Sequence, residues 1–197
     1  MCIIVITGTP GTGKSTVAKI LARENKWVHV DLTKYVIKKR LFTHFDEERE
    51  SYVVDMGKLK RELESFLSKL RGNVVIIEGH YAEESIPDRF TGLVKAVFVF
   101  RTHPLTLWER LAKRGYKTGK IRENVEAELV GVCLHNALSI FKPELIYEVD
   151  TTALTPLETA RVVKGVVTGS FSLPSGPRID WLSKPDVFKV LSRLSTL

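Results

Sequence analysis

Short apolar runs alternate with amphipathic stretches along the first 170 residues of the chain. The runs are rich in β-branched side chains and almost free of charge, which is typical of strands buried on both faces of a parallel sheet. The stretches between them repeat apolar residues at the spacing of one helix face. The alternation predicts an α/β fold with a five-stranded parallel sheet and helices on both faces. The predicted strands are Cys2–Thr7, Trp27–Val30, Val74–Ile77, Val94–Phe100 and Leu145–Val149.

Helices are predicted between these strands and after the last of them. Asp55 can cap a helix whose apolar residues share one face and which ends at Arg71, before Gly72. Residues 155–158 read TPLE, which has the form of a capping box at the start of a helix. The helices are predicted at 14–23, 55–71, 104–115, about 121–141 and 155–167, with a short one at about 183–194.

A break rich in Ser, Pro and Gly at residues 170–177 indicates a linker. We therefore expect one domain over residues 1–169, followed by a C-terminal linker and short helix over 170–197. Because that helix is apolar on one face and Trp181 adds apolar bulk, we expect the tail to fold back onto the domain. A helix that docks onto a partner is the alternative.

A glycine-rich loop lies between the first strand and the first helix. Residues 8–15 read GTPGTGKS and match G-x-x-x-x-G-K-[ST] at every fixed position. Glycines can take positive φ, so successive backbone N–H groups can converge on phosphate oxygens, and the helix N-terminus adds partial positive charge. Lys14 is expected to reach the β- and γ-phosphates of a nucleoside triphosphate, and the Ser15 hydroxyl to hold Mg²⁺.

Polar residues follow several of the predicted strands. Gly8, Glu78, His80 and Arg101 all stand at carboxyl ends, where open parallel sheets bind their ligands. The position makes each of them a candidate for a functional role. The alternatives are structural: a carboxylate that caps neighbouring backbone for Glu78, and a histidine packed beside the sheet for His80.

Two further segments favour a small kinase over the other classes that share a phosphate loop. Residues 31–55 form a polar insert with several Lys and Arg that could fold over an acceptor nucleotide. Residues 110–120 are basic and hold a glycine hinge, so they could close as a lid that supplies positive charge and excludes water. Arg114 before Gly115 favours a lid over a solvated turn.

Composition limits the classes of protein that the chain can belong to, but it does not identify a function. The chain has 197 residues, of which 44% are apolar, enough for the core of one domain. A net charge of +7 suits phosphate ligands and an RNA-rich partner, although a solvated basic surface would give the same balance. Cys2 and Cys133 form neither a disulfide framework nor a metal pattern, and no apolar run is long enough to span a bilayer. We expect a cytoplasmic protein that does not act in a membrane.

Three segments together resemble the atypical adenylate kinases of the CINAP type. They are the phosphate loop, the EGH step at residues 78–80, and the run R-x-x-x-R-G-Y-x-x-x-K-I-x-x-N-x-x-A-E at residues 110–128. The resemblance covers roughly residues 2–165. It implies the nucleoside monophosphate kinase fold, adenylate kinase activity with ATP and AMP, and ATPase activity. It also implies a role in late maturation of the small ribosomal subunit and its 16S rRNA. The partners would be a platform ribosomal protein of the S-eleven type, bound transiently, and pre-ribosomal RNA.

The resemblance also implies roles for single residues and segments. Glu78 and His80 would be the Walker-B-like pair, residues 31–55 the monophosphate-binding insert, and residues 113–123 the lid. The residues that it assigns to ATP are Gly11, Gly13, Lys14, Ser15, Thr16 and Arg114.

Two features depart from the family. The family often has Asp where this chain has Glu78, which is one methylene longer, so its contact with Mg²⁺ can run through water. The basic residue that binds the acceptor cannot be aligned. The candidates are Lys34, Lys38, Lys39 and Arg40.

These observations predict reversible transfer of the γ-phosphoryl group from ATP to AMP. Lys14 and Arg114 would neutralise charge on the transferring group, and Glu78 and His80 would orient a water for hydrolysis. An ATP-driven assembly switch with incidental transfer is a second hypothesis. A kinase for another small acceptor, such as shikimate or dephospho-coenzyme A, is a third.

Overall fold

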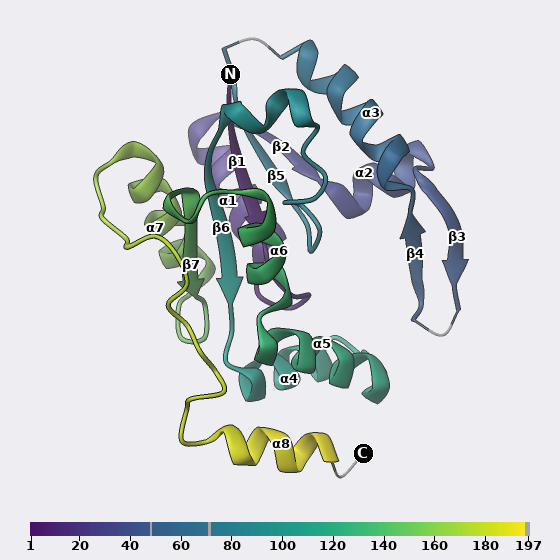
Figure 1. Ribbon diagram of the computed structural model, residues 1–197, viewed down its shortest axis with the longest axis vertical. Helices are drawn as coiled ribbons and strands as arrows, with labels where there is room; N and C mark the ends of the chain where they lie inside the picture. Colours follow the sequence, from purple (N-terminus) through teal and green to yellow (C-terminus); the bar gives the residue numbers. More distant parts are fainter. Residues whose placement is uncertain (48, 71, 196–197) are drawn as a thin grey trace.

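Five parallel strands form the central sheet of the computed structural model, in the order β2-β5-β1-β6-β7 (Figure 1). The structure describes residues 1–47, 49–70 and 72–195. All five predicted strands are confirmed, with ends shifted by one residue at most. Their bounds are β1 (Cys2–Thr7), β2 (Val28–Asp31), β5 (Val74–Glu78), β6 (Val94–Arg101) and β7 (Ile146–Asp150).

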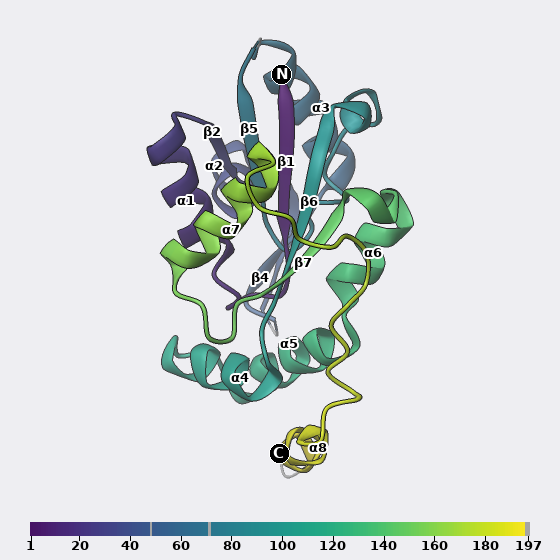
Figure 2. The same ribbon diagram turned by 90° about the vertical axis from the view of Figure 1, so that its left-hand side faces the viewer.

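Alternate residues of each strand face opposite layers of helices, as the two-residue period of a strand requires. In β1, Ile4 and Ile6 pack against α1 (Lys14–Asn25) and α7 (Pro156–Thr168). Figure 2 shows these two helices side by side on one face of the sheet, with α6 on the other. Because both faces are covered, the three central strands, β1, β5 and β6, are apolar along most of their length.

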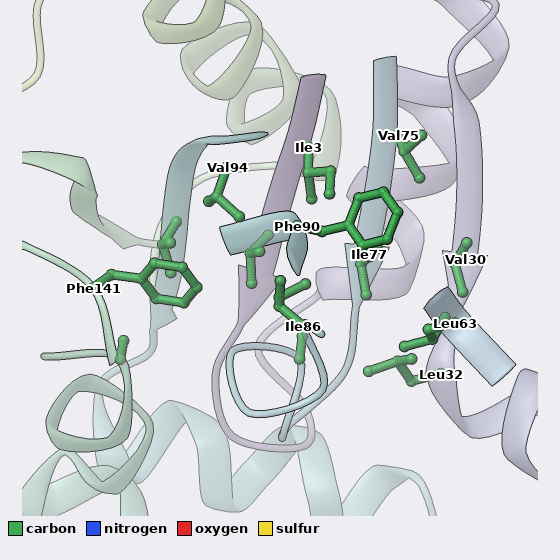
Figure 3. Close-up of a cluster of buried hydrophobic side chains, with 14 of the residues drawn as sticks. Ile3, Val30, Leu32, Leu63, Val75, Ile77, Ile86, Phe90, Val94 and Phe141 are labelled. Carbon is green, nitrogen blue, oxygen red and sulfur yellow. The ribbon is translucent and has the colours of Figure 1, made fainter. Parts of the chain in front are cut away.

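The second face of the sheet builds a larger core (Figure 3). Val75 and Ile77 of β5 point into it and meet Leu63 of α3 (Met56–Ser68). Phe90, from the 3₁₀ helix η1 (Asp88–Leu93), lies beside Val75 and Ile77, and Phe141 lies at the end of the cluster near Val94. Asp55 caps α3 by accepting a hydrogen bond from the Lys58 backbone N–H at 2.9 Å, as predicted. The predicted end of this helix, Arg71, lies outside the described residues.

The polar insert is more regular than its sequence indicates. It contains the short helix α2 (Leu32–Lys39) and an antiparallel hairpin of β3 (Phe42–Asp46) and β4 (Ser51–Val54). The hairpin is held by rings that meet across the two strands, since Tyr52 lies 4.3 Å from Phe42 and 5.1 Å from Phe45 between ring centroids. The alternation of apolar and polar residues is interrupted in these two strands, so the sequence period alone does not predict them.

The prediction of a single long helix at about 121–141 is wrong. The segment forms two helices, α5 (Thr118–Val130) and α6 (Val132–Ile140), which meet at Gly131 with φ 72°. A left-handed residue ends the hydrogen-bond ladder of α5 and lets the chain turn. A Cβ atom at Gly131 would lie 3.5 Å from the Arg101 guanidinium, which is an ordinary contact, so the left-handed backbone and not a lack of space favours glycine here. α5 can then pack against α4 (Pro104–Lys113) while α6 covers the sheet.

The C-terminal tail folds back onto the domain. After the 3₁₀ helix η2 (Pro143–Leu145) and β7, the chain passes through α7 and then returns along the outer edge of β7, where the Gly176 N–H donates to the Ile146 carbonyl at 2.8 Å. It ends in α8 (Val187–Ser195), which lies below α4 and α5 in Figures 1 and 2. Within the described part of the chain, no helix combines the length and apolar character needed to cross a membrane.

Candidate active site

The phosphate loop joins the carboxyl end of β1 to the N-terminus of α1. Gly8, at φ 137°, packs so closely on β6 that a Cβ atom would come within 2.4 Å of the Phe100 carbonyl oxygen. Gly13, at φ 97°, directly precedes α1. Since the first N–H groups of a helix have no acceptor within it, this end of α1 is suited to bind an anion, and its first turn holds no acidic residue.

Lys14 is buried at the start of α1 and lies over its own loop. Its Nζ donates to the carbonyl oxygens of Gly8 at 2.6 Å and Thr9 at 3.0 Å. Burial lowers the pKa of Lys14, and the nearby Cys133 and carboxylates such as Glu78 act in the opposite direction. An ammonium has three N–H donors, so one remains for a phosphate oxygen in the cleft that Lys14 lines.

Two contacts fix the loop from outside. The Thr9 hydroxyl donates to Oε2 of Glu128 in α5 at 2.6 Å. Thr151, directly after β7, donates its hydroxyl to the Thr12 carbonyl at 3.0 Å. Thr12 in turn donates to the Thr9 carbonyl at 2.9 Å, so it shapes the loop. The loop is therefore held before any ligand binds.

Glu78 lies at the end of β5, only 2% exposed, and borders the cleft. Its Oε1 is 3.4 Å from Nε2 of His29 on the neighbouring strand β2, yet neither atom has a hydrogen-bond partner among the described residues. The sequence gives no sign of this contact, because β2 and β5 become neighbours only in the folded sheet. A buried carboxylate oxygen without a partner can accept a hydrogen bond from a ligand or a metal-bound water.

His80 follows Glu78 by two residues and lines the same cleft, with its ring edge-on to Tyr81 at 4.5 Å. Desolvation by the surrounding protein atoms lowers the pKa of His80 to about 4, and the positive charges of Lys14 and Lys120 act in the same direction. The imidazole is therefore neutral at physiological pH. It can donate one hydrogen bond and accept another, which is what orienting a water requires.

Glu83 is a site residue that the sequence did not single out. It is fully buried on the loop after β5, and burial raises the pKa of its carboxyl to about 7. Thr7 and Lys14 lie near enough to favour the charged form, but neither carboxyl oxygen makes a hydrogen bond of good geometry within the described residues. Only the folded loop reveals this group, since its sequence neighbours form no motif.

Arg101 has a structural role, although its place at a strand end made it a candidate for function. It is 2% exposed, and its guanidinium donates to Glu128 at 2.8 Å and to Glu148 at 2.5 Å. Arg110, at the start of the basic segment 110–120, donates to the carbonyl oxygens of Thr151 and Thr152 at 2.8 and 3.1 Å. Both arginines hold backbone and neighbouring helices in place.

A cleft of about 820 Å³ opens at the carboxyl ends of the strands, beyond the phosphate loop. Its walls are the loop, α2, the β3–β4 hairpin, residues 78–84, and the lid between α4 and α5. Arg114 and Lys120 of the lid line it, together with Gly11, Gly13, Lys14, Ser15 and Thr16. The structure thus brings every residue that the sequence assigned to ATP, and the pair Glu78 and His80, to one cavity.

The lid and the hairpin meet across the mouth of this cleft. Lys120 Nζ donates to the carbonyl oxygens of Arg49 at 2.6 Å and Glu50 at 3.2 Å. Lys117 pairs with Glu50 at 2.7 Å, and Arg49 with Glu123 at 3.6 Å. These contacts join segments 70 residues apart and cover the site from the solvent side.

The acceptor candidates of the insert lie away from the cleft. Lys39 pairs with Glu62 at 2.8 Å and Lys34 with Asp31 at 3.5 Å, while Lys38 and Arg40 are exposed outside the cleft lining. The basic residue of the insert that does line the cleft is Arg49. Aromatic side chains from the hairpin and the lid accompany it. They are Phe45, Tyr52 and Tyr116.

The residues present fit Mg²⁺ bound together with a triphosphate. Ser15 offers a hydroxyl at the start of α1, and the unpartnered oxygen of Glu78 can hold a water of the ion. Across the described residues, no group of three or more His, Cys, Asp or Glu could hold a metal by itself. This fits an ion that keeps waters and takes most of its other ligands from phosphate.

Comparisons with known proteins agree with this geometry. Residues 4–131 match the family described as AAA domain. A protein named "Putative adenylate kinase" from Saccharolobus solfataricus is 33% identical over 195 residues, which cover 99% of this chain and 95% of that protein. A protein of the same name from Methanocaldococcus jannaschii is 38% identical over 149 residues, 76% of each chain. The first alignment takes in the tail, which the CINAP resemblance over residues 2–165 did not reach.

Two solved structures with the same fold are shikimate kinases. Shikimate kinase from Acinetobacter baumannii, in complex with shikimate, aligns at a TM-score of 0.61 with 14% identity, over 86% of this chain and 94% of that one. Shikimate kinase from Bacteroides thetaiotaomicron aligns at 0.55 with 19% identity, over 85% and 98%. At such identities the likeness concerns the fold alone, and it confirms the predicted P-loop kinase architecture.

Replacing Glu83 by Gln is expected to stabilise the protein at pH 8 and to change little near pH 5. Because the folded-state pKa of about 7 lies above the ordinary value of 4.5, the folded state holds this proton more tightly. The free energy of unfolding then falls as pH rises from about 4.5 to 7, and at ~1.4 kcal/mol per pKa unit the loss approaches about 3 kcal/mol. Gln resembles the protonated carboxyl and avoids that loss.

Urea unfolding of both proteins from pH 5 to 8, without nucleotide, measures the difference. The lowered pKa of His80 makes the free energy of unfolding rise with pH between about 4 and 6.5. Wild type and Glu83→Gln share this effect, so it cancels in the comparison. Glu109→Gln, at an exposed position of α4, is the matched control. Parallel pH profiles for wild type and Glu83→Gln would contradict the prediction.

Proposed function

This chain belongs to the family of archaeal proteins named "Putative adenylate kinase", and we propose that it transfers the γ-phosphoryl group of ATP to AMP. The observation that carries the proposal is the shared cleft. A phosphate loop with a buried lysine forms one end, and an aromatic hairpin with a cleft-lining arginine forms the other. Its volume lies near the top of the range for small-molecule sites, which leaves room for a donor and an acceptor together.

The donor side is supported by the loop and the lid. Backbone N–H groups of the loop and of the α1 N-terminus would bind the phosphates of ATP, and Lys14 would add its ammonium. Arg114 and Lys120 would approach from the lid. When Mg²⁺ is bound it neutralises the β- and γ-phosphate oxygens, and Ser15 and Glu78 are the residues that would hold it, Glu78 through water.

The acceptor side is supported by the hairpin. Phe45 and Tyr52 line the cleft with exposed rings on which a nucleobase could stack, and Arg49 offers a guanidinium suited to a phosphate. A stacking wall favours a nucleotide acceptor over shikimate, which has no aromatic ring. The contacts of Lys120 and Lys117 with the hairpin would hold the two substrates in one water-poor space.

Transfer needs little proton chemistry from the protein. The AMP phosphate is already anionic, so positioning and neutralisation of charge by Lys14, Arg114 and Lys120 would carry the rate. Hydrolysis would need an oriented water instead. We propose Glu78 and neutral His80 for that task, because both line the cleft and each has hydrogen-bonding capacity to offer.

A role in maturation of the small ribosomal subunit is a further proposal. Its support is the resemblance of residues 2–165 to the CINAP type and the net charge of +7. The partner would be a ribosomal protein of the S-eleven type, with contact to pre-ribosomal RNA, in the cytoplasm. Capture of that ribosomal protein by the purified chain, compared with and without ATP, tests the role separately from catalysis.

Lys14→Ala is expected to lower ATP turnover by about a hundredfold or more, both with AMP and without an acceptor, because charge on the γ-phosphate goes unmet. Lys19→Ala, on an exposed position of the same helix, should leave it unchanged. A coupled assay of ADP formation with AMP, CMP, UMP, shikimate or no acceptor measures both effects. Turnover that never depends on an acceptor would favour an assembly switch, and turnover with shikimate alone would overturn the nucleotide acceptor.

Arg49→Ala is expected to raise the KM for AMP about tenfold with a smaller change in kcat, because it removes a charge-assisted contact with the acceptor phosphate. Lys39→Ala serves as the control, since Lys39 pairs with Glu62 outside the cleft. Steady-state kinetics at saturating ATP separate the two variants. Equal effects from both substitutions would show that Arg49 is not the acceptor residue.

His80→Ala is expected to reduce acceptor-free hydrolysis more than transfer to AMP, since only hydrolysis requires an oriented water. His135→Ala, at an exposed position of α6, controls for loss of a histidine. The two rates are compared on the same preparation at pH 7.5. If both fall by the same factor, His80 acts through structure and not through the water.

A further inference from the structure

One buried carboxylate links the phosphate loop to the C-terminal tail. Glu128 of α5 is 2% exposed, and both of its oxygens are used. Oε2 accepts the hydroxyl of Thr9 at 2.6 Å. Oε1 accepts Arg101 Nε at 2.8 Å, the Thr102 backbone N–H at 3.1 Å and the indole N–H of Trp181 at 3.0 Å. Glu128 therefore joins Thr9 of the phosphate loop to Trp181 of the tail through one carboxylate.

The tail closes the same ionic cluster on its other side. Glu148 of β7 pairs with Arg101 through Oε1 at 2.5 Å, and its Oε2 accepts the backbone N–H groups of Arg178 and Ile179, the latter at 2.8 Å. The Ile179 carbonyl accepts from Arg101 at 3.3 Å. Two carboxylates and one guanidinium leave a buried net charge of −1. The N–H groups of the tail are therefore needed as hydrogen-bond donors to the carboxylate oxygens of this cluster.

Tail contacts also support the helices that carry the lid. Val187, Val190 and Leu194 of α8 pack with Trp181 against an apolar face of α4 and α5. His103, before α4, lies 3.1 Å from Asp186 and edge-on to the Trp181 ring. The domain residues of this cluster are Leu107, Trp108, Leu111, Ile121, Val125 and Leu129.

The contacts form a short chain from the tail to the reacting end of the cleft. Trp181 donates to Glu128, Glu128 accepts from Thr9, and the Thr9 carbonyl accepts from Lys14 at 3.0 Å. Trp181 itself is 4% exposed and lies outside the cleft lining. If the tail leaves, water replaces the indole donor and reaches the cluster, and Glu128 is then less firmly placed to hold Thr9.

We propose that docking of residues 178–195 and binding of a nucleoside triphosphate at the phosphate loop favour each other through Glu128. Trp181 is in this view a positioning residue for the loop. The inference rests on the proposed function, since it requires that the loop binds nucleotide. Linkage makes the effect mutual: the docked tail strengthens nucleotide binding, and bound nucleotide strengthens docking of the tail by the same factor.

Trp181→Phe separates this role from simple stabilisation. Phe keeps an aromatic ring against α4 and α5 and removes the N–H that Glu128 accepts. Phe188→Ala is the matched control, because Phe188 is 78% exposed on the same tail and its removal deletes apolar surface without touching the cluster. Thr9→Val removes the hydroxyl at the other end of the link with little change of shape.

Calorimetric titration of the full chain with ATP and Mg²⁺ gives the decisive comparison. Trp181→Phe is expected to raise the Kd about fivefold, and Phe188→Ala to stay within about twofold of wild type. Thr9→Val with Trp181→Phe should bind within about twofold of Thr9→Val alone, because each breaks the same link. An unchanged Kd for folded Trp181→Phe, or losses that multiply in the double variant, would overturn the coupling.

Hydrogen exchange of the wild-type chain supplies a second arm that needs no variant to fold. Saturating ATP and Mg²⁺ should slow exchange of backbone amides in residues 178–195, although these lie outside the cleft. Unchanged exchange there, with ATP bound, would also overturn the coupling. A wild-type chain that binds no ATP would instead refute the proposed function itself, so the two failures are distinct.

Discussion

The arrangement of the cleft depends on one constraint: the backbone of residues 8–13 must turn back on itself tightly enough for its N–H groups to converge. Gly8 makes the turn possible by packing without a Cβ atom against the Phe100 carbonyl of β6. Glu128 and Thr151 then hold the loop from two other elements. A loop fixed in this way loses little further freedom when it binds phosphate, which is how preorganisation contributes to affinity.

Charge around the loop is arranged in two layers. Lys14, Arg114 and Lys120 face the cleft, where phosphate oxygens would meet them. Behind them, Glu78 and Glu83 are buried beside the sheet, and burial raises the pKa of Glu83 to about 7 although Thr7 and Lys14 favour its charged form. Loss of hydration, together with the positive charges of Lys14 and Lys120, lowers the pKa of His80 and keeps its ring neutral. The side of the site that faces a ligand is therefore electropositive. In its interior, the raised pKa of Glu83 and the lowered pKa of His80 reduce the number of charged groups that are buried.

Local patterns in the sequence predicted the sheet and the phosphate loop, because strand period and the glycine positions act over a few residues. The break at Gly131 was also visible as a glycine, but its left-handed conformation belongs to the junction of α5 and α6, which the helical period on either side does not reveal. The hairpin at residues 42–54 is held by rings that meet across strands, so helical or strand period gives little sign of it. Charge alone could not choose among the basic residues of the insert, since only the fold places Arg49 in the cleft.

Pairs distant in sequence account for most of what sequence reasoning missed. His29 meets Glu78, and Arg101 meets Glu128 and Glu148, only once the strands and α5 are assembled. These contacts show that Arg101, a candidate for function, has a structural role, and they place His29 beside Glu78. The residues assigned to ATP nonetheless share one cavity, because a single motif and one lid supply nearly all of them.

One cleft is proposed to hold a triphosphate donor and a monophosphate acceptor side by side. Titration calorimetry with diadenosine pentaphosphate, in which five phosphates join two adenosines, tests this arrangement most directly. We expect one molecule to bind per chain in the presence of Mg²⁺, more tightly than ATP or AMP, and neither nucleotide to bind afterwards. Binding of AMP to the saturated protein, or affinity no greater than that of ATP, would contradict it.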